Sequence, residues 1–180
     1  MDDWYYKGVA LQRQKMYAEA VRAYDHALLL KPKCAKCWYN KGNSLMKLHK
    51  SKEALHALDQ AISIHPQYIL VYLKKGNILR ISKNYRESIA AYDVALKINP
   101  HFFDVLYYKG LVLETMKQYS EAVALYDKVL DITPLHVKAT FRKGVVSMKG
   151  GNYPRGLKYI FLSFVNALHL LYYAISSYLI

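Results

Sequence analysis

The sequence is poor in cysteine, and its seven histidines are scattered along the chain. Only two of its 180 residues are cysteine, and they form a single CxxC pair, Cys34 and Cys37. A structural zinc site takes four ligands, and a redox CxxC usually follows a strand. We therefore interpret this spacing as chance and expect reduced thiols, as in the cytosol. HExxH, nucleophile-elbow and phosphate-loop motifs are also missing from the sequence. We expect no catalytic residue, metal or cofactor, and no small-molecule substrate.

Two further patterns are missing. No segment alternates between apolar and polar residues at period two over the length of a strand, and no Gly/Ser-rich linker interrupts the chain. The first residues are acidic and then helical in pattern, without a secretory signal or transit peptide, which favours a cytoplasmic protein. An all-helical fold is the expectation.

Acidic residues are scarce as well. There are 13 of them against 26 lysines and arginines, for a net charge of +13. Successive 34-residue segments from residue 1 to residue 136 carry +2, +3, +4 and −2, whereas residues 137–180 carry six basic residues and no acid. This excess favours nucleic acid, acidic peptides or anionic lipid as partners; a solvated lysine-rich surface would explain it without any partner.

What the sequence does contain is a strict period of 34 residues. Glycine recurs at this spacing, each time directly after a lysine, at Gly8, Gly42, Gly76, Gly110 and Gly144. Repeats of this length are single structural units that bury their apolar faces only by stacking on one another. The period therefore predicts a solenoid, a fold that typically binds another molecule along its concave wall.

Each repeat has the pattern of two helices. Apolar residues fall at three-to-four spacing between Trp4 and Lys15, and again between Tyr17 and Leu30. This spacing predicts two amphipathic helices, and the short connection makes them antiparallel. Small residues at the crossings allow close approach, and larger residues fill the space beside them. A proline then ends each of the first four repeats: Pro32, Pro66, Pro100 and Pro134.

The positions of these aromatic, glycine, alanine and proline residues resemble the tetratricopeptide repeat. The resemblance implies a right-handed α-solenoid with four full repeats, at about 1–34, 35–68, 69–102 and 103–136, and a degenerate fifth at 137–164. The lysine before each glycine departs from the family, which usually has an apolar residue there. Because an aspartate recurs with the same period, we favour lysine–aspartate pairs over a lysine ladder that follows RNA. The aspartates are Asp25, Asp59, Asp93 and Asp127.

The resemblance also implies a function, which is to bind a peptide or helix of a partner protein in the concave groove. The family's groove positions, carried over to this chain, hold aromatic side chains with polar neighbours. They are Tyr5, Tyr39, Asn43, Leu73, Asn77, Arg80, Tyr107, Lys138, Phe141 and Arg142. Some family members bind an acidic chaperone C-terminus through a five-residue carboxylate clamp. Asn77, Lys138 and Arg142 match three of its positions, so the full clamp is absent, but an acidic peptide remains an option.

The C-terminal segment extends past the repeats. Residues 159–180 contain no Asp, Glu, Lys or Arg, and we expect residues 165–180 to form a separate hydrophobic helix. Its polar residues form only a thin stripe, made of Ser163, Asn166, His169, Ser176 and Ser177. Three interpretations stay open: a membrane anchor, a helix buried in a self-association interface or cap, and a cap completed by missing sequence. The basic residues before the segment support an anchor on the cytosolic face of a membrane, whereas Asn166 and His169 oppose it.

From the sequence we expect a non-catalytic scaffold for protein binding, comparable to co-chaperone adaptors. A tail-anchored membrane adaptor that uses the same groove is the alternative. A basic solenoid that binds nucleic acid is the weaker alternative.

Overall fold

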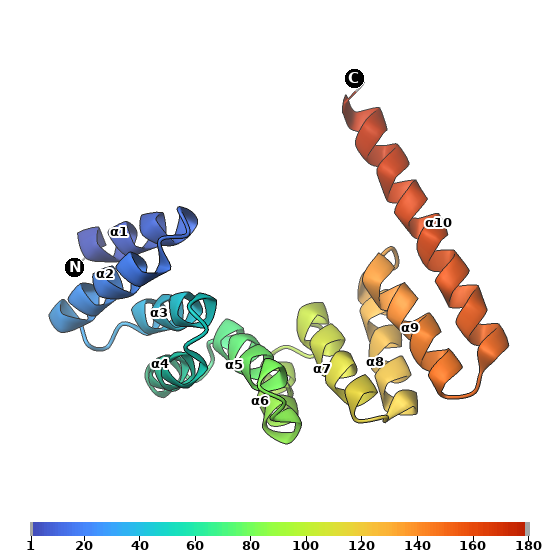
Figure 1. Ribbon diagram of the computed structural model, residues 1–180, viewed down its shortest axis with the longest axis horizontal. Coiled ribbons are helices and arrows are strands. Elements are labelled where there is room, and N and C mark those ends of the chain that lie inside the picture. The colour runs from blue at the N-terminus through green and yellow to red at the C-terminus, as the bar shows by residue number, and fades with distance from the viewer. Residues whose placement is uncertain (1, 179–180) are drawn as a thin grey trace. The chain divides into compact units, whose positions relative to one another are not determined.

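The computed structural model describes residues 2–178, which form ten α-helices and no strand (Figure 1). They divide into an N-terminal unit, residues 1–98, and a C-terminal unit, residues 99–180. The N-terminal unit contains α1 (Asp2–Arg13), α2 (Tyr17–Leu30), α3 (Ala35–Lys47), α4 (Ser51–Ile64), α5 (Ile69–Ile81) and α6 (Tyr85–Ile98). The C-terminal unit contains α7 (Phe103–Thr115), α8 (Tyr119–Ile132), α9 (Val137–Lys149) and α10 (Tyr153–Tyr178). The expected all-helical fold, with two helices per repeat, is confirmed.

Within each unit, every helix packs against the next one along the chain. In the N-terminal unit, α1 also contacts α3, and α3 contacts α5. These three are the first helices of consecutive repeats. They therefore form one layer of the unit, with α3 in the middle.

Small and large residues alternate at the helix crossings, as expected. A Cβ atom added to Gly76 would lie 2.3 Å from Cε1 of Tyr92, so the tyrosine ring occupies the space that the glycine leaves. The second repeat has a leucine at the tyrosine position, and a Cβ on Gly42 would lie 3.0 Å from Cδ2 of Leu58. Four large residues fill this position with no exposed surface: Tyr24, Leu58, Tyr92 and Tyr126. Each crossing is therefore a glycine packed against one buried side chain.

Two backbone features end the helices. Lys31 and His65, each directly before a proline, have φ values of −141° and −138°, because a proline disfavours the helical conformation in the residue before it. Within each repeat, one residue with positive φ ends the first helix, as in helix C-caps. These residues are Lys15, His49, Lys83, Lys117 and Gly151. The sequence did not reveal this turn, since glycine occupies it in only one repeat.

The C-terminal helix differs from the expectation. α10 runs without a break from Tyr153 to Tyr178, so the expected boundary between residues 164 and 165 is wrong as a helix boundary. The physical reason is that no glycine or proline follows Gly156 in the sequence, so nothing there ends a helix. Residues 179–180 and the side chains of Ser176 and Ser177 lie outside the described part of the chain.

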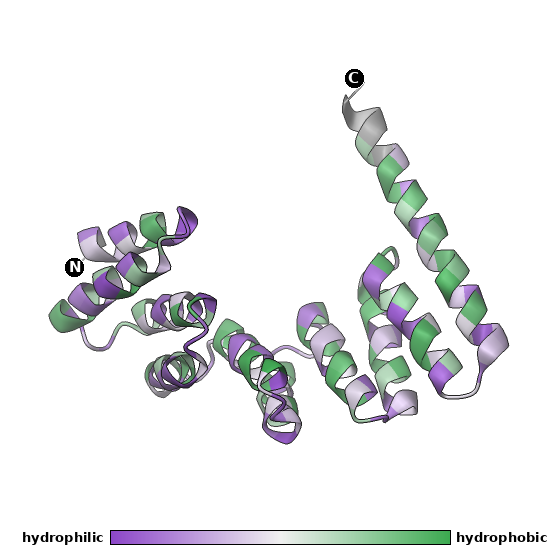
Figure 2. Cartoon of the chain, viewed as in Figure 1, coloured by the Kyte–Doolittle hydropathy of each residue, from purple (hydrophilic) through white to green (hydrophobic). Residues whose placement is uncertain are grey.

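Two polar residues of α10 turn inward. Ser163 and Asn166 are buried, and α9 is the helix against which α10 packs, so these residues do not supply the polar outer face that a cap needs. The rest of the helix is coloured mostly as hydrophobic (Figure 2). None of the helices among residues 2–178 is long and apolar enough to cross a membrane.

Candidate functional site

The first candidate site follows one face of α3. Residues three, four, seven and ten or eleven positions after Lys36 share this face because of the helical period. They are Tyr39, Asn40, Asn43, Met46 and Lys47. We call the surface formed by this face and by the neighbouring parts of α1 and α5 the α3 groove. Its two first-helix neighbours, α1 and α5, both contact α3.

The α3 groove has a pocket at each end. The pocket near the start of α3 has a volume of about 450 Å³ and is lined by Tyr5, Tyr6, Lys31, Lys33, Cys34, Ala35, Lys36, Ile64 and His65. The pocket near the end of α3 has a volume of about 420 Å³ and is lined by Met46, Lys47, His49, Ser51, Ile78 and Ile81. From residue 36 to residue 47 a helix rises about 16 Å, which matches about five residues of an extended peptide.

Three tyrosines from the first two repeats cluster in the α3 groove. The rings of Tyr39 and Tyr68 lie 5.1 Å apart, and the side-chain amide of Asn40 donates a hydrogen bond to the Tyr5 hydroxyl at 3.3 Å. Burial raises the pKa of Tyr68, and its neighbours Tyr39 and Tyr5 raise it further. All three tyrosines are half-buried, so each also keeps an exposed part. Tyr68 was missed from the sequence, although an aromatic residue recurs 34 positions later at Phe102.

Asn43 and Asn77 occupy the same position in consecutive repeats, but their surroundings differ. Oδ1 of Asn77 accepts a hydrogen bond from the Tyr92 hydroxyl at 2.8 Å. In the repeat of Asn43, the residue equivalent to Tyr92 is Leu58, which has no hydroxyl. Oδ1 of Asn43 is accordingly buried without a hydrogen-bond partner in the chain. Asn43 therefore has an unpaired acceptor that lies buried beneath the middle of the α3 groove.

Two other predicted groove residues of the N-terminal unit lie deeper than expected. Leu73 is only 7% exposed, so it packs in the interior and offers almost no surface to a partner. Arg80 is half-buried and is engaged in interactions with the rest of the chain. The groove of this unit therefore rests on Tyr5, Tyr39 and Asn43.

In the C-terminal unit, Tyr107 lies in an aromatic cluster. Its ring is 5.9 Å from that of Tyr126 and 5.4 Å from that of His136. Burial raises the pKa of Tyr107, while the positive charge of Arg142 and a hydrogen bond to it act in the opposite direction. Burial is also the main cause that raises the pKa of Tyr126, followed by the negative charge of Glu114.

Glu114 is a buried charged residue of this cluster that the sequence analysis did not single out. It is only 8% exposed, and its Oε1 lies 2.8 Å from Nζ of Lys149 and 3.5 Å from a guanidinium nitrogen of Arg142. The signal was available, because Glu114 follows Arg80 by one period and reverses its charge. Since Asn77 and Arg142 are both engaged inside the chain, two of the three clamp-like residues already have partners. Lys138 and Phe141 are exposed on α9.

The recurring lysines pair with the recurring aspartates. Nζ of Lys75 lies 2.6 Å from Oδ1 of Asp59, and Lys143 pairs with Asp127 in the same way. A third pair of this kind joins Lys41 to Asp25, at 2.5 Å. In each case the lysine of one repeat meets the aspartate of the repeat before it. The expectation of paired lysines is confirmed for these three contacts, which ties consecutive repeats together.

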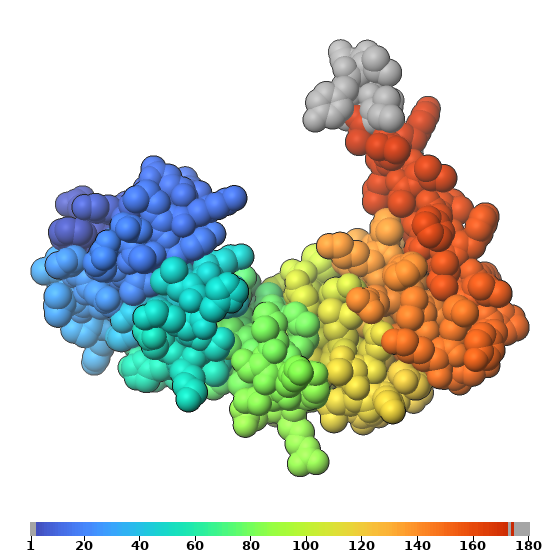
Figure 3. Space-filling view, viewed as in Figure 1, coloured from blue at the N-terminus to red at the C-terminus, as the bar shows by residue number. Residues whose placement is uncertain are grey.

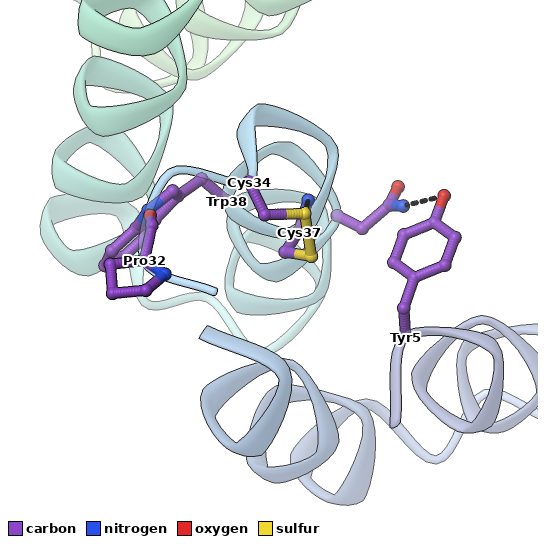
Figure 4. Close-up of a disulfide and its surroundings, with 6 residues drawn as sticks. Tyr5, Pro32, Cys34, Cys37 and Trp38 are labelled. Atoms are coloured by element: carbon purple, nitrogen blue, oxygen red, sulfur yellow. Dashed lines mark hydrogen bonds between the residues drawn. A yellow bond between two sulfur atoms is a disulfide. The ribbon is translucent and has the colours of Figure 1, made fainter. Parts of the chain in front are cut away.

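Cys34 and Cys37 contradict the expectation of reduced thiols. They form a disulfide at the start of α3 (Figure 4). The physical reason is the helical turn: Cys34 precedes the helix and Cys37 lies in its first turn, with Cα atoms 5.3 Å apart. Figure 4 shows Tyr5 of the α3 groove close to this disulfide. Within the described residues, no group of three or more His, Cys, Asp and Glu side chains is arranged to hold a metal ion.

The outer face of α10 forms a second candidate site. Five large apolar residues follow one another at alternating spacings of four and three, and each is more than half exposed. They are Leu157, Phe161, Phe164, Leu168 and Leu171. This is the spacing of a coiled-coil seam. The part of α10 that Figure 3 colours red projects beyond the other helices of its unit. We call this row of residues the α10 stripe.

Comparison with family models agrees with the geometry. Models described as "Tetratricopeptide repeat" match residues 2–34, 35–68, 73–135 and 107–165. No protein among the curated sequences matches this chain.

Solved structures of similar fold cover nearly the whole chain. A crystal structure of MamA is 20% identical, covers 91% of this chain and 96% of its own, and has a TM-score of 0.86. MamA residues 41 to the end from Desulfovibrio magneticus RS-1 is 15% identical, with coverage of 93% and 95% and a TM-score of 0.87. YrrB, described as a TPR protein with an unusual peptide-binding site, is 20% identical, with coverage of 93% and 89% and a TM-score of 0.76. At these identities the likeness concerns the fold.

Proposed function

Because the chain belongs to the tetratricopeptide repeat family, we propose that it is a non-catalytic scaffold that binds a peptide segment of a partner protein in the α3 groove. The observation that carries this proposal is the unpaired acceptor of Asn43. A buried acceptor without a partner is costly, and a backbone N–H of a bound peptide removes that cost. YrrB, whose fold is similar, is described as a TPR protein with an unusual peptide-binding site.

The rest of the α3 groove suits an extended peptide. The half-buried faces of Tyr5, Tyr39 and Tyr68 offer flat apolar surface, with hydroxyl groups at the rim. The pocket at the far end is lined by apolar Met46, Ile78 and Ile81. These features provide contacts for alternate side chains of a strand-like peptide, while Asn43 binds its backbone.

The charge around the groove favours an acidic peptide. Lys31, Lys33 and Lys36 line one end pocket, and Lys47 lines the other. No residue described as lining either pocket is acidic. Acidic side chains at the two ends of the peptide would therefore meet positive charge, which speeds association and selects against basic peptides.

The experiment is to select peptides from a random library against the full chain and to measure their affinity for the native chain and three variants. Asn43→Ala should weaken binding about tenfold. One buried hydrogen bond contributes about 1.4 kcal/mol, and this free energy corresponds to a tenfold change in affinity. Leu58→Tyr should also weaken binding, although residue 58 lies outside the groove, because its hydroxyl would engage Asn43 as Tyr92 engages Asn77. Glu53→Ala on the exposed surface of α4 is the control. Unchanged affinity in both folded variants would contradict the proposal.

A second function is favoured by the α10 stripe, and we propose that it pairs with the α10 stripe of a second copy. Phe161 stands at the position where earlier repeats contact the next repeat. It follows Asp127 by one period, and Asp127 pairs with Lys143 of the next repeat. Phenylalanine cannot pair with a lysine, so the element that covers this face is apolar rather than another repeat of the same type. Residues 159–180 contain no Asp, Glu, Lys or Arg, so this segment does not repel the same segment of a second copy. An antiparallel pair keeps the basic starts of the two α10 helices apart.

Light scattering of the full chain during size-exclusion chromatography tests this pairing. The native chain should be a dimer at micromolar concentration, and Phe161→Asp, which restores the residue type of the other repeats, should be a monomer. Phe141→Asp on α9 should leave the dimer intact. A monomeric native chain would exclude the pairing, and recovery of the native chain with lipid vesicles, lost in Phe161→Asp, would assign the stripe to a membrane surface instead.

A further inference from the structure

We propose that Cys34 and Cys37 form a thiol–disulfide exchange site for small anionic thiols, with Cys34 as the sulfur that reacts. This inference does not depend on the peptide-binding proposal. It rests on the pocket at the start of α3, on the different exposure of the two cysteine residues, and on the lysines around them.

The two cysteines are not equivalent. Cys37 is fully buried, whereas Cys34 is only half-buried and lines the pocket of about 450 Å³. An incoming thiol therefore reaches Cys34 and not Cys37. This difference gives the exchange a direction: the attacked sulfur is Cys34, and the sulfur that leaves is Cys37.

The surroundings of Cys34 stabilise negative charge on sulfur. Cys34 is the N-cap of α3, and its Sγ accepts a hydrogen bond from the backbone N–H of Cys37 at 3.2 Å. The first turn of α3 contains no acidic residue. Lys31, Lys33 and Lys36 line the same pocket. A helix N-terminus and nearby lysines are the conditions that favour a thiolate over a thiol.

The exchange balances with two equivalents of thiol. A thiolate RS⁻ attacks Sγ of Cys34, the Sγ–Sγ bond breaks, and its electron pair passes to Sγ of Cys37, which takes a proton. A second RS⁻ attacks the sulfur of the R group in the mixed disulfide and releases Cys34 as a thiolate. The products are the reduced protein and RSSR, so the protein is reduced by two electrons and the thiol is oxidised. The reverse sequence oxidises the protein.

Because its two cysteines are close in sequence, the disulfide stabilises the fold only weakly. The two cysteines are separated by only three positions in sequence, and short loops constrain the unfolded chain least. The first turn of α3 also already holds these residues near one another. Other repeats form the same turn without cysteine, since Val105 and Ala139 occupy the position of Cys37.

The pocket selects the thiol by charge. Three lysines and His65 line it together with Tyr5 and Tyr6, and none of its described lining residues is acidic. A thiol that carries carboxylates, such as glutathione, is therefore attracted, whereas a cationic thiol such as cysteamine is repelled. Since these charges are exposed to solvent, salt should screen both effects.

The experiment measures how fast the Cys34–Cys37 disulfide is reduced in the full-length chain, with the fluorescence of Trp38 as the signal. This residue follows Cys37 directly, and its indole donates a hydrogen bond to the Pro32 carbonyl at 3.0 Å. In low salt we compare the ratio of the glutathione rate to the cysteamine rate. This ratio should be at least tenfold higher for the folded chain than for the chain unfolded in urea. Lys33→Glu combined with Lys36→Glu should remove this preference. Lys52→Glu combined with Lys83→Glu, on exposed positions elsewhere, should keep it.

A second measurement assigns the reacting sulfur. In Cys37→Ala, which copies Ala139 of the fifth repeat, oxidised glutathione should form an adduct with Cys34 that mass spectrometry detects. In Cys34→Ser, the buried Cys37 should form at least tenfold less adduct. Equal glutathione-to-cysteamine ratios in the folded and unfolded chains, or equal adducts on the two cysteines in folded variants, would overturn the proposal.

Discussion

At the scale of single residues, the helix crossings depend on how a glycine fits against one large side chain. Gly76 faces the ring of Tyr92, which is fully buried and rigid, whereas Gly42 faces the flexible end of Leu58. We therefore predict that Gly76→Ala lowers the free energy of unfolding by about 2 kcal/mol, since overpacking outweighs the better helix propensity of alanine. Gly42→Ala should change it by less than about 1 kcal/mol. Urea unfolding of both variants checks this difference.

The matching double variant sharpens that prediction. Tyr92→Leu copies the leucine of the second repeat, so Gly76→Ala together with Tyr92→Leu should be less destabilised than the sum of the two single changes. If the effects simply add, the steric explanation for the recurring glycine is wrong.

The buried tyrosines make a prediction about alkaline pH. Burial raises the pKa of Tyr126 far above its ordinary value near 10, and Glu114 raises it further. Above pH 10 the unfolded chain loses this phenolic proton while the folded chain keeps it, so the folded state binds more protons and stability falls as pH rises. The expected slope is about 1.4 kcal/mol per pH unit for each such tyrosine. Below pH 10 this effect is absent.

Urea unfolding at pH 9 and pH 11 measures the effect. Between these values the native chain should lose more stability than Tyr126→Phe, because phenylalanine has no proton to lose. Tyr6→Phe, at a residue that is 66% exposed, should behave like the native chain. An identical loss in Tyr126→Phe and the native chain would exclude Tyr126 as a cause of alkaline unfolding.

At the scale of helices, the lysine–aspartate pairs join one repeat to the next with different strengths. Lys143 is nearly buried where it meets Asp127, whereas the Lys75–Asp59 pair is more exposed. Water screens an exposed pair, and a buried lysine without its partner is costly. Double-mutant cycles with alanine should therefore give a coupling of about 1–2 kcal/mol for Lys143–Asp127 and below about 1 kcal/mol for Lys75–Asp59. Equal couplings would mean that burial does not control these contacts.

Most helices could be predicted from the sequence, because their causes are local or periodic. The apolar spacing, the proline and the glycine crossing all lie within one repeat, and the same features recur in the first four repeats. The end of this agreement is equally instructive. In α10, Leu168 stands where the closing proline would be, so the pattern could not indicate where the helix ends, and the structure shows one long helix.

The site was harder to predict, because its properties depend on differences between repeats. Family positions placed Asn43 and Asn77 in one class, yet Leu58 in place of a tyrosine leaves only Asn43 unpaired. Glu114 escaped notice because its partners, Arg142 and Lys149, lie in another helix. Likewise, a CxxC spacing does not reveal that one cysteine is buried and the other lines a pocket.

At the scale of the whole molecule, repetition and its exceptions have separate roles. The repeated residues build the scaffold through glycine crossings and lysine–aspartate pairs, and these recur in both units. The exceptions mark the proposed sites: Leu58 frees Asn43, Cys34 and Cys37 replace ordinary helix-start residues, and Phe161 replaces an aspartate. We infer that binding specificity is encoded where a repeat departs from its neighbours.

Site-specific photo-crosslinking tests the central claim, that a peptide binds in the α3 groove, most directly. A photoreactive amino acid would replace either Lys47, which lines the pocket at the end of α3, or Lys52, which lies on α4 and lines a different pocket. Both residues are exposed lysines, so the two substitutions are matched. With a peptide selected for binding to the native chain, the account predicts crosslinking from position 47 and little from position 52. Crosslinking from position 52 alone, with both proteins folded and binding, would contradict it.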